Sequence, residues 1–127
     1  MSDKCHILYV DDHEDSAVMF QHLLSMSDYE VTTAATVEQA VAQAMSKEFD
    51  LYVLDRRLPD GMGADLCRRL KQLSPDIPVI LYSGDAYEIH RLEGLKAGAD
   101  AYVPKPHIDK LIAAVHEILS QRACAAA

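Results

Sequence analysis

The spacing of short apolar runs constrains the fold of this chain more than any other feature. Four runs are too short for helices, are rich in Val, Ile and Tyr, and do not alternate with polar residues. Such runs predict strands buried on both faces, and they span residues 6–10, 51–54, 78–82 and 101–103. A weaker strand candidate lies between the first two, at residues 30–35.

The segments between these runs carry the periodicity of amphipathic helices. In the last of them, residues 108–119, apolar side chains recur at i, i+3, i+4 and i+7. Similar stripes occupy residues 17–24, 37–45 and 66–73, and a looser one residues 86–96, with Gly98 expected to cap its end. Strand and helix thus alternate five times, which predicts an α/β domain with a parallel sheet, right-handed crossovers and helices on both faces.

Length and charge narrow the class of protein further. The chain has 127 residues, which fits one domain, expected over residues 1–122 with a disordered tail at 123–127. Asp and Glu number 20 against 12 Lys and Arg, so the net charge is −8. This excess disfavours direct binding to nucleic acid or to anionic membranes and suits a cation or a basic partner.

The spacing of the three cysteines and the lengths of the apolar segments predict the cellular compartment of the protein. The cysteines are far apart in the sequence and form no C-x-x-C pair, which indicates free thiols in a reducing compartment. We see neither a secretory h-region nor a transmembrane stretch. The expected location is therefore the cytoplasm, without membrane insertion.

Polar side chains stand where four of the five predicted strands end. Asp11 and Asp12 follow the first strand, Asp55 the third, Ser83 the fourth and Lys105 the fifth. Because parallel strands bring their carboxyl ends to one edge of the sheet, and ligands bind there, these residues are the candidate site.

The residue types at this edge favour phosphoryl chemistry. Three gathered carboxylates repel one another, and a hard divalent cation such as Mg²⁺ relieves that repulsion. Ser83 and Lys105 can hold a phosphoryl group, and Asp55 is the best-placed nucleophile for an aspartyl-phosphate. Each residue alone also fits a turn, a helix start or a surface charge, so the prediction depends on their joint order.

Histidine and tyrosine are expected to be mainly structural. None of the six histidines shows the spacing of a metal-ligand motif. They are expected on the surface or on helix faces, and contact of His13 with the metal site is the disfavoured alternative. Tyr9, Tyr52 and Tyr82 are expected in the core or in helix packing.

Four segments together resemble the receiver domain of two-component response regulators, over residues 5–121. They are ILYVDDHED, DLYVLDRRLPDGMG, PVILYSGD and GADAYVPKP. The resemblance implies a flavodoxin-like, doubly wound (βα)5 domain with strand order 2-1-3-4-5. It also implies signalling by phosphorylation and no enzymatic activity beyond the domain's own phosphorylation and dephosphorylation.

The resemblance assigns roles to the acids and to the second of the two arginines that follow Asp55. Asp55 would accept a phosphoryl group from a histidine kinase or a histidine phosphotransfer protein. Asp12, Asp55 and the backbone carbonyl of Arg57 would bind Mg²⁺ directly, and Asp11 would act largely through water.

It also implies how the signal leaves the site. Ser83 and Lys105 would contact the phosphoryl oxygens, and Tyr102 would be the aromatic switch. The Lys105–Pro106 peptide would be cis. The surface formed by the fourth helix, fifth strand and fifth helix would then meet a downstream protein.

The chain departs from the family pattern at a few positions. Met62 replaces a small polar residue, and His107 follows the Lys-Pro pair in place of an apolar one. We also expect Arg57 to overhang the site and to pair with Asp85 or Glu88.

Other functional classes fit less well. Phosphatases of the haloacid-dehalogenase type need a second Asp two residues beyond the nucleophile, where this chain has Arg57. A dinucleotide-binding module needs glycines in the first turn, and VDDHEDS has none. A phosphorylation-independent adaptor remains open, as does a stand-alone regulator, a phosphorelay intermediate, or a receiver cut from a hybrid kinase or multidomain regulator.

Overall fold

A single parallel sheet organises the molecule. The computed structural model describes residues 4–27, 29–84 and 88–122, the side chains of 88–90 excepted. Its five strands are β1 (His6–Val10), β2 (Glu30–Ala34), β3 (Leu51–Leu54), β6 (Val79–Ser83) and β7 (Ala101–Pro104). They pair in parallel in the order β2-β1-β3-β6-β7. Counted within this sheet, that is the predicted order 2-1-3-4-5.

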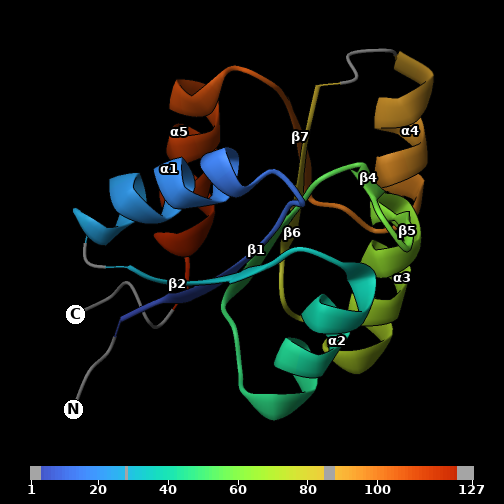
Figure 1. Ribbon diagram of the computed structural model, residues 1–127, viewed down its shortest axis with the longest axis horizontal. Helices are drawn as coiled ribbons and strands as arrows, with labels where there is room; N and C mark the ends of the chain where they lie inside the picture. The colour runs from blue at the N-terminus through green and yellow to red at the C-terminus, as the bar shows by residue number, and fades with distance from the viewer. Residues whose placement is uncertain (1–3, 28, 85–87, 123–127) are drawn as a thin grey trace.

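Helices cover both faces of the sheet, as predicted (Figure 1). α1 (Glu14–Ser25) and α5 (Ile108–Leu119) lie on one face; α2 (Val37–Ser46), α3 (Gly63–Leu73) and α4 (Glu88–Lys96) lie on the other. Successive residues of each strand point to opposite faces, so Tyr9 packs with α1 and α5, whereas Leu8 packs with α2 and α3. The chain therefore has two apolar cores separated by the sheet.

The central strands are buried as their composition predicts. Every residue of β3 and β6 is buried, and so are the last four residues of β1. The edge strands β2 and β7 are partly exposed, because each has a neighbour on one side alone. The unalternated pattern was therefore a sound guide for the interior of the sheet and a weaker one at its edges.

A two-stranded hairpin after β3 was not predicted. β4 (Arg57–Leu58) and β5 (Gly61–Met62) pair antiparallel, and the turn between them carries Asp60. The Asp60 carboxylate accepts hydrogen bonds from the backbone N–H of Val37 (2.7 Å) and of Glu38 (3.1 Å). The hairpin is thereby fastened to the first turn of α2.

Local backbone predictions are confirmed at two positions. Gly98 follows α4 with φ of +107°, a left-handed conformation that favours glycine and confirms its role as a cap. The Lys105–Pro106 peptide is cis, as the family resemblance implies.

The cysteine prediction needs a correction. Cys67 is a buried free thiol, but Cys5 is disulfide-bonded, so the expectation of free thiols is wrong at that position. A spacing argument cannot see which cysteines the fold brings together. Cys124 lies outside the described residues, as does the expected tail at 123–127. Within the described part of the chain, no helix is long and apolar enough to cross a membrane.

Candidate functional site

The carboxyl ends of β1 and β3 bring the acidic residues together. The backbone N–H of Asp55 donates to the carbonyl of Val10 (2.9 Å), which extends the β1–β3 ladder by one residue. The backbone N–H of Asp11 donates in the same way to Ala34 at the end of β2 (3.0 Å). Strand register therefore holds the two carboxylates beside each other.

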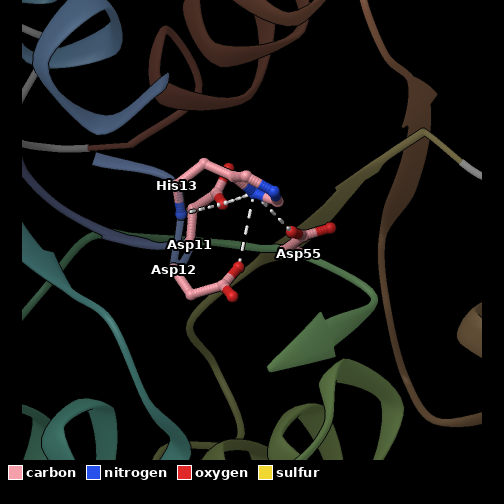
Figure 2. Close-up of side chains that lie close together, drawn as sticks. All are labelled: Asp11, Asp12, His13 and Asp55. Carbon is pink, nitrogen blue, oxygen red and sulfur yellow. Dashed lines mark hydrogen bonds and ion pairs between the residues drawn. The ribbon is translucent and has the colours of Figure 1, made fainter. Parts of the chain in front are cut away.

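We call the group formed by Asp11, Asp12 and Asp55 the acidic cluster. One carboxylate oxygen from each, together with one ring nitrogen of His13, lies within 4.8 Å of all the others (Figure 2). Asp11 and Asp55 are only 3% and 7% exposed, whereas Asp12 faces solvent. The cluster is thus open on the side of Asp12 and His13 and closed beneath.

Lys105 supplies positive charge from the opposite side of the cluster. Its Nζ donates to Asp11 Oδ2 at 2.7 Å and to Asp55 Oδ2 at 3.4 Å. The residue directly follows β7, where its backbone N–H donates to the carbonyl of Ser83 (2.7 Å). Lys105 and Asp11 are 94 residues apart in the chain, and the pairing of strands in the sheet brings them into contact.

Ser83 and Tyr102 lie on the neighbouring strands. Ser83 is the last residue of β6, is 3% exposed and is paired in register with Pro104. Tyr102 is half-buried on β7, where it lines a cavity of about 190 Å³ between α3 and α4 together with Leu81 and Gly94.

Arg57 lies outside this convergence of side chains. Its backbone is paired with Met62 in the hairpin and its side chain is exposed. Its suggested partners cannot be placed, because Asp85 and the side chain of Glu88 lie outside the described residues. The predicted ion pair of Arg57 therefore stays a prediction.

The two buried carboxylates differ in their electrostatics. Burial, reinforced by the charge of Asp11 and opposed by Lys105, holds the pKa of Asp55 above its ordinary value. For Asp11, burial also acts upward, but hydrogen bonds from Lys105 and His13 bring its pKa below the ordinary value. Lys105 thus compensates the charge of Asp11 better than that of Asp55.

Lys105 itself is held in its charged form. Burial acts to lower the pKa of Lys105, but the hydrogen bond to Asp11 and the charge of Asp55 outweigh burial and raise it. The ammonium group is therefore a permanent positive charge at the floor of the acidic cluster.

Two contacts of the site were missed or underrated in the sequence. Tyr9 is a core residue, as expected, yet its hydroxyl donates to Asp11 Oδ2 (2.9 Å). The period of a strand could have shown it, because residues two apart point to the same face. His13 Nδ1 lies 2.9 Å from Asp11 Oδ1. The position of His13 directly after Asp12 is compatible with this contact, but sequence position does not set the direction of the ring.

The donor set of the acidic cluster fits Mg²⁺. The cluster offers hard carboxylate oxygens, and the pKa of Asp55 is raised because nearby positive charge does not fully compensate for its burial beside Asp11. Hard oxygen donors in small number, with room for water on an open side, are what Mg²⁺ prefers. Asp12 and Asp55 stand at that open side, with Asp11 beneath them.

A family model decides the classification. The model described as the response regulator receiver domain matches residues 7–116 of the chain. The chain belongs to the response regulator receiver domain family. The order of the motifs and the fold agree with this membership, and the predicted flavodoxin-like class is confirmed.

Relatives of known name are similar over most of the chain. The alkaline phosphatase synthesis transcriptional regulatory protein PhoP of Bacillus subtilis is 37% identical over 79% of this chain and 42% of its own length. The phosphate regulon transcriptional regulatory protein PhoB of Pseudomonas aeruginosa is 39% identical over 79% of this chain and 44% of its own length. The chain thus spans about half the length of the curated relatives it matches.

Solved receiver domains match most of the chain. A CheY-like receiver domain protein from Methanospirillum hungatei superimposes with a TM-score of 0.88 at 32% identity, covering 93% of this chain and 95% of that one. The BeF3-activated DrrB receiver domain gives 0.84 at 32% identity, covering 93% of this chain and 99% of that one.

Proposed function

We propose that this receiver domain is a Mg²⁺-dependent phosphoacceptor switch in a two-component system. A phosphohistidine on a sensor kinase or on a histidine phosphotransfer protein would be the donor, and Asp55 the acceptor. The observation that carries the proposal is the convergence of Asp55 with Asp11 and Lys105 at one sheet edge, within a family of receivers.

In the proposed transfer, a carboxylate oxygen of Asp55 attacks the phosphorus. The new bond joins that oxygen to phosphorus, and the phosphorus–nitrogen bond of the donor histidine breaks and returns its electron pair to the imidazole. The reaction needs positioning and charge neutralisation rather than a general base. The sheet supplies the position of Asp55, through its backbone bond to Val10.

The residues around Asp55 would hold the incoming group. Lys105 would exchange part of its contact with the carboxylates for the phosphoryl oxygens, as a point charge. Ser83, buried at the end of the adjacent strand, would donate its hydroxyl to one of those oxygens. Both residues would then act on the phosphorylated state more strongly than on the free carboxylate.

Mg²⁺ would be held by Asp12, Asp55 and the Arg57 carbonyl, with Asp11 contributing through water. When bound, the ion supplies positive charge that offsets the negative charge of phosphoryl and carboxylate oxygens. The open side of the acidic cluster, next to Asp12, is where the donor would approach.

The output would be a shift between two conformations of one surface. We define the output surface as α4, β7 and α5. A contact between Ser83 and the phosphoryl group would favour an inward position of Tyr102, which lines the cavity next to α4. Phosphorylation would thereby change the population of surfaces seen by a downstream protein.

The setting of the switch is also part of the proposal. We assign residues 1–122 to the receiver domain and expect it to work in the cytoplasm. The curated relatives named above are transcriptional regulators, but a net charge of −8 argues against nucleic-acid contact by this domain itself. Any DNA binding would belong to another domain or another protein.

Intact mass after incubation with acetyl phosphate tests the proposal. With Mg²⁺, the wild type should gain one phosphoryl group, and Asp55→Asn should gain none. Asp65→Asn is the matched control, because Asp65 is exposed on α3, and it should behave as the wild type. Chelation of Mg²⁺ should prevent the gain in every variant.

The alternative outcomes are distinct. If neither the wild type nor Asp55→Asn gains a phosphoryl group, from acetyl phosphate or from a cognate phosphohistidine donor, the phosphorylation-independent adaptor would be favoured. A phosphoryl group on Asp55→Asn equal to that of the wild type would mean that Asp55 is not the acceptor.

A further inference from the structure

We propose that His13 is an additional ligand of the divalent cation in the acidic cluster, through Nδ1. The site would then combine carboxylate oxygens with one imidazole nitrogen and would favour Zn²⁺, Co²⁺ and Ni²⁺ more than oxygen ligands alone do. This inference rests on the proposed metal site and adds a ligand to it.

The position of the ring nitrogen carries the inference. His13 Nδ1 lies 2.9 Å from Asp11 Oδ1, 3.3 Å from Asp12 Oδ1 and 3.9 Å from Asp55 Oδ2. In Figure 2, dashed lines join the ring of His13 to the carboxylates of Asp11, Asp12 and Asp55. The nitrogen therefore faces the same space as the oxygens of the cluster.

These separations match the spacing of ligands around one ion. Neighbouring ligands that each lie about 2.1 Å from an octahedral cation are about 3.0 Å from one another, and opposite ligands about 4.2 Å. Two of the three nitrogen–oxygen distances, 3.3 and 3.9 Å, fall between these limits, and the third, 2.9 Å, is within 0.1 Å of the lower one. A single ion can thus be shared by Nδ1 and the carboxylates without a large movement of the chain.

The backbone around His13 ties the residue to the acidic cluster, and the ring itself contacts the aspartates of that cluster. The His13 N–H donates to Asp11 Oδ1 (2.9 Å), which ties the residue to the cluster. His13 is also the N-cap of α1, but its side chain makes no capping hydrogen bond there. With 67% of the side chain exposed, the ring is not needed to fill a core.

The chemistry of imidazole sets the expected selectivity. Imidazole suits Zn²⁺, Co²⁺ and Ni²⁺, whereas Mg²⁺ prefers oxygen donors. In the neutral ring, Nδ1 can hold a cation while Nε2 keeps the proton. His13 should therefore strengthen the binding of transition-metal ions and affect the binding of Mg²⁺ little.

Titration calorimetry of the untagged full chain tests this selectivity with Mg²⁺ and Zn²⁺ in separate experiments. His13→Ala should weaken Zn²⁺ binding about tenfold or more, since even outer partners of metal ligands change affinity by about 10–100-fold. Mg²⁺ affinity should change by less than about threefold. His22→Ala, an exposed histidine of the same helix, is the matched control and should change neither affinity.

The visible absorption of bound Co²⁺ gives a second measurement on the same variants. Its bands should shift between the wild type and His13→Ala, because a nitrogen ligand is lost, and should not shift in His22→Ala. Zn²⁺ binding that is equal or tighter in His13→Ala, with unchanged Co²⁺ bands, would overturn the inference, since the ring would then be a competitor of the ion or a bystander.

Failure of the proposed function would look different. If the wild type binds Zn²⁺ through His13 but gains no phosphoryl group from any donor, the switch proposal falls and the ligand inference stands. If phosphorylation with Mg²⁺ proceeds normally and His13→Ala leaves Zn²⁺ binding unchanged, the ligand inference alone falls.

Discussion

Asp11 and Asp55 are the same residue type, lie at the ends of neighbouring strands, and yet have different environments. Asp11 accepts hydrogen bonds from Tyr9, His13 and Lys105, and its pKa is lowered despite burial. Asp55 accepts from the backbone N–H of Arg56 (2.8 Å) and more distantly from Lys105, and burial raises its pKa. The carboxylate proposed to react is therefore the one that its surroundings stabilise less.

This difference predicts that Asp55→Asn stabilises the protein in the absence of divalent cations. A carboxyl whose folded-state pKa is raised above 3.8 contributes stability that is present below the ordinary pKa and is lost as pH rises through the folded-state value. The wild type therefore loses this contribution as pH rises, whereas Asn does not titrate. Thermal unfolding at pH 7 with a chelator should show a midpoint a few degrees higher for Asp55→Asn.

The dependence of the unfolding midpoint on pH and on Mg²⁺ tests this electrostatic explanation. The advantage of Asp55→Asn should shrink as pH falls toward 4, near the ordinary pKa of aspartate, and should also shrink when Mg²⁺ is added to both proteins. Asp65→Asn should show no such advantage. A lower midpoint for metal-free Asp55→Asn at pH 7 would contradict the electrostatic explanation.

Among the elements, the hairpin after β3 and the start of α3 determine how the acceptor backbone is held. The backbone N–H of Gly63, the first residue of α3, donates to the carbonyl of Arg56 (2.6 Å). A Cβ on Gly63 would overlap the backbone carbonyl oxygen of Asp55 and lie 3.2 Å from Arg56 Cα. The helix thus packs on the acceptor's own main chain, at a distance that only glycine permits.

Gly63→Ala should therefore damage both stability and phosphorylation. Backbone shifts forced by an added methyl group cost about 1–3 kcal/mol in the free energy of unfolding, and they would displace Asp55. Urea denaturation and the acetyl phosphate assay measure the two effects. Gly84→Ala is the control, because a Cβ there would meet nothing within 4 Å; equal behaviour of the two variants would argue against this packing constraint.

The bond between the hairpin and α2 leads to a separate prediction. The Asp60 carboxylate caps the backbone N–H groups of Val37 and Glu38, and these bonds lower the pKa of Asp60. Asp60→Ala should lower the unfolding midpoint and speed hydrogen exchange at both amides, because helix N-terminal N–H groups lose their acceptor. Asp65→Ala should leave both amides protected; unchanged exchange in Asp60→Ala would mean that the cap is not formed in solution.

At the scale of the whole molecule, the apolar cores on the two faces of the sheet support the strand ends that carry the acidic cluster. On the α1 and α5 side, Phe20 is fully buried and stacks on Tyr9, with ring centroids 4.3 Å apart. The hydroxyl of Tyr9 then donates to Asp11. The core on this side therefore reaches the acidic cluster through the hydroxyl of Tyr9.

Phe20→Ala should lower the free energy of unfolding by about 3–5 kcal/mol, the usual cost of removing a buried phenylalanine side chain. Val18→Ala is the control on the same helix, since Val18 is 59% exposed, and its effect should stay within about 0.5 kcal/mol. Denaturant unfolding measures both. Similar losses for the two variants would show that burial in this core does not dominate stability.

Much of the fold is predictable from the periodicity of the chain. The apolar runs at residues 6–10 and 51–54 match β1 and β3 residue for residue, because burial on both faces leaves a signal within the strand itself. The hairpin at residues 57–62 escaped, because strands of two residues are too short to carry a period. The bonding of Cys5 was also not predicted, because the spacing of cysteines along a chain does not show which of them form disulfides.

The sequence by itself determined the order of the elements, the family, and the set of polar residues at the sheet edge, because these follow from local periodicity and motif spacing. Only the tertiary structure decided which carboxylate Lys105 compensates better, that Tyr9 reaches Asp11, and that the ring of His13 faces the acidic cluster. These depend on distances of a few ångströms between side chains, which strand register and helix packing set. Spacing along the chain can place two residues on one face, as for Tyr9 and Asp11, but it does not fix those distances.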